Sequence, residues 1–259
     1  MADSFYFKGV TLLITHYNRS SSLERLLAAF NKLQCTFEDI VVSDDGSKPE
    51  HLESIRSLQS SYSFRLITSP HNKGLGNNIN KGQDAVKTPY TLYIQEDFVP
   101  LKTFPSKLQD ALQFMNEQED LDMVRFYAYF KYPYLKPVKN GFSEMRFKIW
   151  YPGYKKFYMY SDHPHLRRSN FLQKFGRYKE GVSPDKAEYG MMMSFLKHKG
   201  KFLFYDDHKG LLDQVNTRTE PSTVKRKFWS ESDNKFITII RHVYRGVKFN
   251  YHYFIKRGN

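Results

Sequence analysis

The chain has 259 residues, of which 40% are hydrophobic, and its formal net charge is +13. This length and hydrophobic content suffice for one large α/β domain or two small ones, and the charge predicts an anionic partner such as nucleic acid, an acidic membrane surface or a phosphate-bearing substrate. The single cysteine, Cys35, excludes a disulfide framework and a thiolate zinc cluster, and no stretch approaches the roughly 20 apolar residues of a membrane-spanning helix, so we expect a cytoplasmic protein.

The first hundred residues alternate between strand and helix patterns. Residues 10–15 form a continuous apolar run typical of a buried strand, and Ser21 and Glu24 predict a capping box that opens a helix through Phe30. Strands that alternate with helices predict a parallel sheet with right-handed crossovers. We expect the alternation to continue with a strand at 40–43, a helix at 50–58, a strand at 64–68, a helix at 79–86 and a strand at 91–94.

The second half is less regular. Ser183 and Pro184 provide an N-cap and a first-turn proline for a helix that runs to about residue 199, and a strand at 201–205 follows. Upstream of that helix we expect a helix at 105–115, a strand at 123–130, and loops with short antiparallel strands at 132–160, where Tyr, Phe, Lys, Pro and Gly occur without a clear period.

No composition break marks a linker between domains. We therefore predict a single domain over residues 1–225, with residues 1–100 and 101–225 as its two halves. A basic, aromatic C-terminal segment over residues 226–259 follows the domain.

Polar residues follow the predicted strands at the point where each strand ends. Asp44 and Asp45 come directly after the strand at 40–43, where a buried carboxylate is costly unless it meets hydrogen-bond donors. The base N–H and ribose hydroxyl groups of a bound nucleoside are such donors. An Asx turn with a helix cap, for which Asp-Gly-Ser is well suited, is the alternative that the sequence leaves open.

A second polar group lies farther along the chain. Residues 72–82 contain two Asn-Lys-Gly sequences, and the apolar strand at 90–94 ends in the Gln-Glu-Asp sequence of residues 95–97. Because ligands bind at the carboxyl ends of strands in open α/β sheets, we expect these residues to share a crevice with the aspartate pair. Oxygen ligands there suit Mg²⁺ or Mn²⁺, which would bridge to a diphosphate. An acidic surface turn is the alternative.

The order of these segments resembles the family-2 type glycosyltransferases of the GT-A fold. Residues 12–19 resemble the opening strand of that family with its Tyr-Asn-Arg ending, 40–47 its Val-Asp-Asp-Gly-Ser strand, 72–82 its helix with two Asn-x-Gly sequences, and 95–97 its Asp-x-Asp motif. The resemblance implies an α/β fold with a Rossmann-like, mostly parallel central sheet, helices on both faces and a small antiparallel subregion on the acceptor side.

The resemblance also implies a nucleoside-diphosphate sugar as the donor. Gln95 stands in place of the first Asp of the Asp-x-Asp motif, so a divalent cation, Mg²⁺ or Mn²⁺, would fall on Asp97, with Glu96 as a helper. His208, which follows the strand at 201–205, would complete the metal shell, and a surface turn is its alternative. The residues that the resemblance assigns to nucleotide-sugar binding are Thr15, Tyr17, Asn18, Arg19, Asp44, Asp45, Asn72, Gly74, Asn80, Gln95 and Glu96.

In the second half, Asp185 and Glu188 resemble the acidic motif that opens the acceptor-side helix of this family. Because they are three residues apart, the two carboxylates share one face of the predicted helix. An inverting transfer needs a general base that takes the proton of the acceptor hydroxyl, and we predict Glu188 for this role. The alternative is that both carboxylates merely stabilise the helix N-terminus. The predicted acceptor is a glycan or a lipid-linked saccharide.

Two basic groups near residue 165 are open to more than one interpretation. Arg167 and Arg168 are candidates for contacts with a diphosphate, and the alternative is that they are solvated at the start of a helix. His163 and His165 flank a proline, and we predict a loop at the border of the acceptor cleft there.

The C-terminal segment combines an apolar and a basic helical stripe. A basic helix with an apolar face is typical of a segment that lies in a membrane interface, so an anionic membrane, at the inner face of the cell membrane, is a predicted partner. Packing of the apolar stripe on the protein's own core is the alternative. The apolar stripe consists of Phe236, Ile240, Val243 and Val247, and the basic one of Arg241, Arg245 and Lys248.

Three rival functions belong to other classes. A nucleotidyltransferase would use a similar sheet, but residues 15–20 do not form a glycine-rich loop after the first strand. A scaffold that has lost activity is suggested only by Gln95. A nucleic-acid-binding module would fit the charge, but the chain contains no recognisable RNA or DNA motif, so we predict no nucleic-acid partner.

Overall fold

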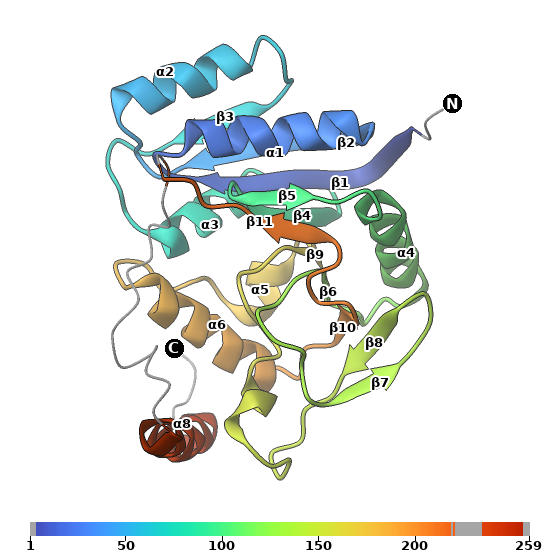
Figure 1. Ribbon diagram of the computed structural model, residues 1–259, viewed down its shortest axis with the longest axis vertical. Helices are drawn as coiled ribbons and strands as arrows, with labels where there is room; N and C mark the ends of the chain where they lie inside the picture. The colour runs from blue at the N-terminus through green and yellow to red at the C-terminus, as the bar shows by residue number, and fades with distance from the viewer. Residues whose placement is uncertain (1–3, 219, 221–234, 256–259) are drawn as a thin grey trace.

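The computed structural model describes residues 4–218, 220 and 235–255. Within these residues a nine-stranded sheet has the order β3-β2-β1-β4-β9-β6-β10-β8-β7, and β11 pairs separately with β5 (Figure 1). The strands are β1 (Phe5–His16), β2 (Cys35–Asp44), β3 (Arg65–Thr68), β4 (Tyr90–Gln95), β5 (Phe98–Pro100), β6 (Met123–Arg125), β7 (Leu135–Pro137), β8 (Phe142–Met145), β9 (His165–Arg168), β10 (Phe202–Tyr205) and β11 (Leu212–Gln214). The helices are α1 (Ser20–Lys32), α2 (Pro49–Leu58), α3 (Leu75–Asp84), α4 (Phe104–Glu117), α5 (Phe171–Phe175), α6 (Pro184–Lys197) and α8 (Lys235–Ile255), and η1 (Tyr154–Phe157) is a short 3-10 helix.

The first four strands form the parallel half of the sheet, as the alternation of strands and helices predicted. β3, β2, β1 and β4 all run in one direction, and Thr15 of β1 lies opposite Ser43 of β2 and Gln95 of β4. β9 runs antiparallel to both of its neighbours, β4 and β6, and β8 and β7 form an antiparallel edge. The predicted α/β class, with a mostly parallel sheet and an antiparallel subregion, is confirmed.

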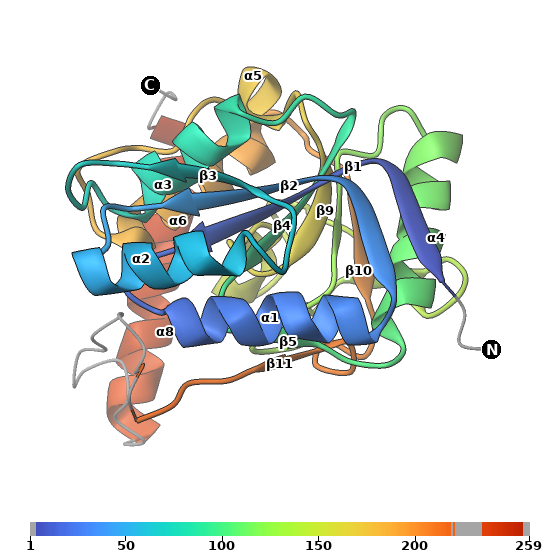
Figure 2. The same cartoon turned by 90° about the horizontal axis from the view of Figure 1, so that it is seen from above.

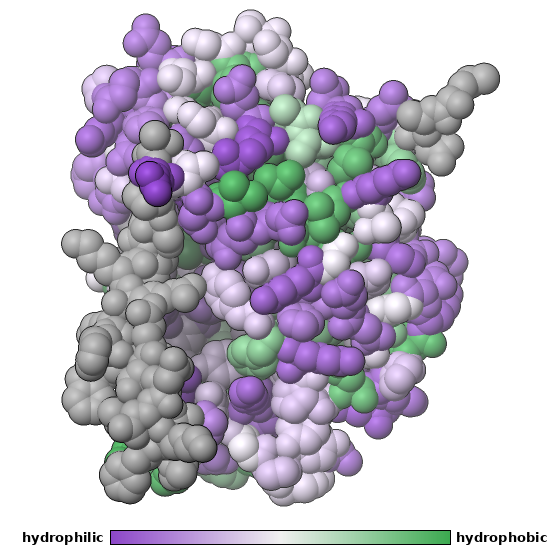
Figure 3. All heavy atoms as spheres, in the orientation of Figure 1, coloured by the Kyte–Doolittle hydropathy of each residue, from purple (hydrophilic) through white to green (hydrophobic). Residues whose placement is uncertain are grey.

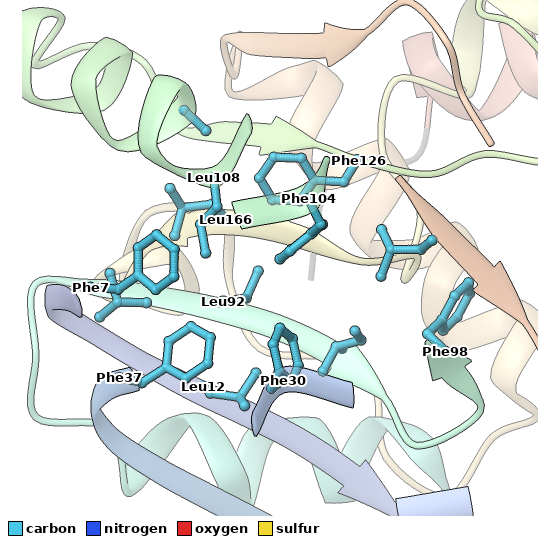
Figure 4. Packing of buried hydrophobic residues seen from close by; sticks show 14 of the residues in the cluster. Phe7, Leu12, Phe30, Phe37, Leu92, Phe98, Phe104, Leu108, Phe126 and Leu166 are labelled. Carbon is cyan, nitrogen blue, oxygen red and sulfur yellow. The ribbon is translucent and has the colours of Figure 1, made fainter. Parts of the chain in front are cut away.

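Helices cover both faces of the sheet. α1 and α2 lie on one face and α3 and α6 on the other (Figure 2). Successive side chains of a strand point to opposite faces, so Leu12 and Ile14 of β1 belong to one core and Leu13 to the other. In the first core, Phe30 of α1 packs edge-on against Phe104 of α4 (Figure 4). The sheet is therefore held between two apolar layers.

The outer surface is mostly polar. Hydrophilic residues cover much of the face seen in Figure 3, and hydrophobic ones form smaller groups between them. Among the described helices, none combines the length and the apolar character needed to cross a bilayer.

The strand predicted at residues 123–130 is shorter than expected. β6 ends at Arg125. The N–H of Phe126 then donates to the carbonyl of Pro164, a residue just before β9, and the following residues are irregular. Backbone hydrogen bonds to a loop, which no local pattern encodes, therefore end the strand.

Neither Arg167 nor Arg168 opens a helix, as one interpretation of the sequence had it. Both lie in β9, and Arg167 is fully buried with its Nη2 donating to Oε1 of Gln83 (2.8 Å). Arg168 donates to the carbonyl of Met115 in α4 (2.7 Å). The two guanidinium groups fasten helices to the sheet, so the solvated alternative is wrong.

The predicted capping box is also wrong. α1 begins at Ser20 with Arg19 at the N-cap position, and no side chain of the predicted box caps it. Instead, the carboxylate of Glu220 accepts hydrogen bonds from the N–H groups of Ser21 (2.9 Å) and Ser22 (2.8 Å). A carboxylate from the far end of the chain thus satisfies the free N–H groups of the first turn, where negative charge is also favoured by the helix dipole.

α8 lies at one end of the molecule, beside α6 (Figure 1). Phe249 is buried against the rings of Tyr189 in α6 and Phe157 in η1, at centroid distances of 5.1 and 5.5 Å. The alternative in which the apolar stripe packs on the core is wrong for the three stripe residues whose side chains are described, because Ile240, Val243 and Val247 are all exposed. The side chains of Phe236 and Arg241 lie outside the described part of the chain.

Candidate active site

The parallel strands bring the three predicted motifs to one edge of the sheet. His16 lies opposite Asp44 at the ends of β1 and β2, and Thr15 lies opposite Gln95 at the end of β4. The segments that leave these strand ends carry Asp45 and Asp97. This is the edge at which open α/β sheets bind their ligands.

Asp44, the last residue of β2, is fully buried and surrounded by donors. Its carboxylate lies 2.8 Å from Nδ1 of His16, and it accepts hydrogen bonds from the N–H groups of Gly46 and Ser47 (3.0 Å each) and from the hydroxyl groups of Ser47 and Thr68. Burial alone would raise the pKa of Asp44, but these hydrogen bonds together hold it well below its usual range. Asp44 thus forms the Asx turn that the sequence left open as an alternative.

Asp45 joins the end of β2 to the segment before α3. Its two carboxylate oxygens accept hydrogen bonds from the N–H groups of Lys73 (2.9 Å) and Gly74 (2.8 Å). Gly74 has a φ of 88°, which a glycine adopts without strain. Burial raises the pKa of Asp45, although these bonds and the charge of Lys81 oppose the shift. Asp45 and the exposed turn that begins at Asn72 therefore form one unit beside the site.

Asn80 ties the two halves of the chain together. Its amide group accepts from the N–H of Tyr178 (3.0 Å) and donates to the carbonyl of Tyr178 and to Glu180 (2.9 Å each). These two residues lead into α6, which carries Asp185 and Glu188. The predicted nucleotide-binding helix α3 is thus fixed to the segment that positions the predicted base.

The end of β1 supplies three more of the predicted residues. Thr15 Oγ1 lies 3.2 Å from the hydroxyl of Tyr93, and Tyr17 and Asn18 are half-buried. Asn18 has a φ of 53°, and its side-chain oxygen accepts from the N–H of Lys48 (2.8 Å). Tyr17 is the member of this group with ring surface still open to solvent.

A buried ion pair lies where β4 ends. Nη1 of Arg19 is 3.3 Å from Oδ2 of Asp97 and 3.7 Å from Oε1 of Glu96, and all three side chains are almost fully buried. The same Oδ2 atom accepts from Nε2 of Gln214 (2.9 Å). Asp97 Oδ1 is buried without a hydrogen-bond partner among the described residues, and so is Nε of Arg19. Since an unsatisfied buried carboxylate oxygen is costly, this arrangement favours an incoming cation or hydroxyl donor.

A segment from the far end of the chain completes this group. The N–H of Val215, just after β11, donates to the carbonyl of Asp97 (2.8 Å), and Arg19 Nη2 donates to Asn216 (2.9 Å) and to the carbonyl of Glu220 (3.2 Å). We call residues 213–218 and 220 the strap. Sequence analysis missed Gln214, Asn216 and Glu220, because isolated polar residues after a short strand carry no recognisable pattern.

The residues at the end of β4 fit a divalent cation in part. Asp97 Oδ1 is a free carboxylate oxygen, and Mg²⁺ is commonly held by one or two carboxylates together with substrate phosphates. Burial, and then the charge of Asp97, raises the pKa of Glu96 to about 8, so Glu96 would ionise as a cation arrives. Within the described residues, no three His, Cys, Asp or Glu side chains gather into a metal site. His208 is therefore not placed with Asp97 and Glu96 as a third ligand, and the prediction for it is wrong in this structure.

The predicted base lies in a second carboxyl pair. Glu188 Oε1 accepts from the backbone N–H of Asp162 (3.1 Å), and the Asp162 carboxylate accepts from the hydroxyl of Tyr160 (2.9 Å). Burial raises the pKa of both carboxyl groups, and Asp162 and Glu188 raise each other's further through repulsion of their charges. Asp185, one turn earlier on α6, is exposed. Of the two predicted carboxylates, Glu188 has the environment that enzymes use to tune a base.

Comparison with known families identifies the chain. The family model described as glycosyl transferase family 2 matches residues 11–178, which is more than half of the sequence. The chain belongs to glycosyl transferase family 2. The match contains every residue predicted to bind the nucleotide sugar, together with Asp97, and it stops before Asp185, Glu188 and His208.

Curated relatives of this glycosyltransferase match over a short stretch only. The poly-beta-1,6-N-acetyl-D-glucosamine synthase of Staphylococcus epidermidis is 24% identical over 92 residues, which are 36% of this chain and 22% of the relative. The synthase of Staphylococcus aureus strain COL is 25% identical over the same length. The matched part is thus about a fifth of each relative.

Solved structures resemble this glycosyltransferase over most of its length. Residues 1–349 of Staphylococcus aureus TarS, in complex with UDP-GlcNAc, superpose with a TM-score of 0.57 at 14% identity, covering 95% of this chain and 73% of that one. The mannosyltransferase PcManGT of Pyrobaculum calidifontis, in complex with GDP-Man and Mn²⁺, gives a TM-score of 0.56 at 12% identity, covering 82% and 58%. At these identities the likeness concerns the fold, and it confirms the predicted GT-A architecture.

Proposed function

We propose that the enzyme transfers a sugar from a nucleoside-diphosphate donor to a hydroxyl group of an acceptor, with inversion at the anomeric carbon. The observation that carries the proposal is the unpartnered Asp97 oxygen beside buried Arg19, at the ligand-binding edge of the sheet and inside the segment that matches the family. The structural neighbours whose titles name UDP-GlcNAc and GDP-Man support a nucleotide sugar as the donor.

The end of β4 would bind the diphosphate. Arg19 is held in place by Asp97, Asn216 and the carbonyl of Glu220, so its guanidinium needs no reorganisation when negative charge develops on the leaving group. A divalent cation, Mg²⁺ or Mn²⁺, would be held by Asp97 with Glu96 and would neutralise the same charge. Gln95, the residue before this pair, would donate a hydrogen bond to the sugar or the ribose.

The nucleoside would lie against the ends of β1 and β2. Tyr17 offers a ring face on which a base can stack. Asp45 and the turn of Asn72 to Gly74 form the neighbouring wall, because the Asp45 carboxylate fixes the backbone of that turn. Donor hydroxyl groups would compete with this backbone for the same carboxylate.

Glu188 would act as the general base. As the acceptor oxygen attacks the anomeric carbon, the carboxylate takes its proton, and the bond between that carbon and the diphosphate breaks on the opposite side. The N–H of Asp162 fixes one oxygen of Glu188, so the other is left to meet the acceptor. The raised pKa makes the carboxylate a stronger base than an exposed glutamate.

The acceptor we propose is a glycan or a lipid-linked saccharide in the cytoplasm. The curated relatives are named as synthases of a polysaccharide, which supports an acceptor of this class. A lipid-linked saccharide would place the enzyme at the inner face of the cell membrane, whose anionic lipids match the net charge of +13.

A donor panel tests the proposal. The purified protein would be heated with UDP, GDP and nucleotide sugars, each with and without Mn²⁺, since a ligand that binds the folded state raises the melting temperature. We expect stabilisation by one nucleotide family and, on addition of acceptor, release of the nucleoside diphosphate. Release of pyrophosphate instead would identify a nucleotidyltransferase, and stabilisation without any turnover would identify an inactive scaffold.

A further inference from the structure

α8 presents two faces of different character. The inner face packs on the body: Phe249 is buried, His252 hydrogen-bonds the hydroxyl of Tyr189 (2.8 Å), and the ring of Tyr253 lies 5.3 Å from that of Phe147. The helix is therefore held at a fixed position by its own buried side. What the opposite side contacts is open.

The outer face is apolar along its whole described length. Its side chains recur at intervals of three and four residues, which places them in one continuous stripe. They are among the most exposed large apolar groups of the described chain, with Val247 at 67% and Phe254 at 68% exposure. Monomeric proteins rarely expose such a stripe without a partner for it. The outer face consists of Ile240, Val243, Tyr244, Val247, Tyr251, Phe254 and Ile255.

The charge around this stripe selects the partner. Residues 235–259 contain six Lys and Arg residues and not one Asp or Glu. Lys248 is half-buried at the border of the stripe, over the rings of Tyr244 and Tyr189. A second copy of the helix would bring like charges together without a carboxylate to pair with them, whereas an anionic lipid surface supplies the opposite charge.

We propose that the outer face of α8 lies in the interface of a membrane that contains anionic lipids, with the apolar stripe among the acyl chains and the basic residues at the phosphate groups. The helix is too polar to cross the bilayer, so it lies parallel to the surface. The inner face contacts Tyr189, the neighbour of Glu188 in the sequence, so membrane binding would bring the predicted base close to the lipid surface. The proposal does not depend on glycosyl transfer.

The test is sedimentation of the full-length protein with lipid vesicles. We expect binding to vesicles of phosphatidylcholine with phosphatidylglycerol, much weaker binding to phosphatidylcholine alone, and loss of binding as salt screens the charges. Val243→Asp together with Val247→Asp should lower the bound fraction about tenfold, since both residues would carry charge into the apolar layer. Val138→Asp, on an exposed apolar residue of the loop between β7 and β8, is the matched control and should bind like the parent protein.

Two further measurements keep the outcome unambiguous. Because both valine side chains are exposed, the double variant should keep the parent's melting temperature and its oligomeric state in sedimentation equilibrium. Arg241→Gln with Lys248→Gln should weaken binding to anionic vesicles and leave the weak binding to neutral ones unchanged. A parent protein that ignores anionic vesicles at low salt overturns the proposal. A parent dimer that the double valine variant dissociates overturns it as well and assigns the stripe to a second copy of the chain.

Discussion

The ends of β2 and β4 carry carboxylate pairs at the same edge of the sheet, yet the two pairs are used differently. Asp44 and Asp45 meet donors from nearby turns, and Asp44 has five of them. Asp97 meets Arg19 and Gln214, which come from distant parts of the chain, and keeps one oxygen without a partner among the described residues. Saturated carboxylates build structure, and a carboxylate left with a free oxygen is prepared for a ligand.

Glu188 extends this comparison to the acceptor half and should show the largest effect. Glu188→Gln removes the proton acceptor but keeps the shape, so turnover should fall by about two to four orders of magnitude while donor affinity is kept. In the parent enzyme, the rate should rise with pH through a pKa above the ordinary value of about 4.3 for glutamate. Steady-state kinetics across pH measure both.

Asp185→Asn is the matched control for Glu188→Gln, because it lies on the same helix and is exposed. It should cost much less activity. If Asp185→Asn proved the more damaging change in two equally folded variants, the base would be Asp185.

Asp97→Asn tests the ligand-binding end of the comparison. The change removes the charge beside Arg19 but keeps Gln214 in contact, so the fold should survive while turnover falls by about two to three orders of magnitude, as for loss of a preorganised electrostatic group. Kinetics with and without Mn²⁺ measure the effect. Near-normal turnover, in an enzyme that is also indifferent to chelators, would show that the site lies elsewhere.

Asp44→Asn tests the structural end. Five donors surround the carboxylate, so the variant should lose about 3 kcal/mol of stability. Because the folded state lowers the pKa of Asp44, the stabilisation is present above the ordinary pKa of about 3.9 and is lost as the pH falls through the folded value. Denaturant unfolding should therefore separate parent and variant at neutral pH and bring them together in acid. Equal stability at pH 7 contradicts the structural role.

Glu220→Gln tests whether the strap serves the site or only the fold. Loss of the charge at the start of α1 should cost about 1 kcal/mol of stability. Because Glu220 also contacts Arg19 through its carbonyl, we expect the KM for the donor to rise severalfold with kcat almost unchanged. Glu53→Gln, an exposed change on α2, is the control. A change in stability alone, with an unaltered KM, would leave the strap a purely structural element.

Glu96→Gln should have the smallest effect and should depend on pH. The folded state raises the pKa of Glu96 to about 8, so it holds a proton that the unfolded chain has lost above about pH 4.5, and stability falls as the pH rises between these values. The variant should melt with the parent at pH 5 and a few degrees above it at pH 8. Thermal unfolding at the two pH values decides, and an equal shift at both would mean that Glu96 is not protonated in the folded protein.

Local patterns predicted what local physics determines. The alternation of apolar runs gave the four parallel strands, and the residues at their ends were correctly expected to share one edge, because the register of parallel strands brings their ends together. The capping of α1 by Glu220, the burial of Arg167 in β9 and the contact between Asp162 and Glu188 depend on residues far apart in sequence. No periodicity encodes such contacts, so the strap and half of the second carboxyl pair could not be found before the structure.

Titration of a nucleoside diphosphate into the parent protein and into the two aspartate variants tests the central claim most directly. The account predicts that UDP or GDP, in the presence of Mn²⁺, binds the parent and binds Asp97→Asn at least about tenfold more weakly, whereas Asp44→Asn, measured where it is still folded, keeps its affinity within about threefold. Equal binding by the parent and Asp97→Asn, or no binding of either nucleotide to the parent, would contradict it.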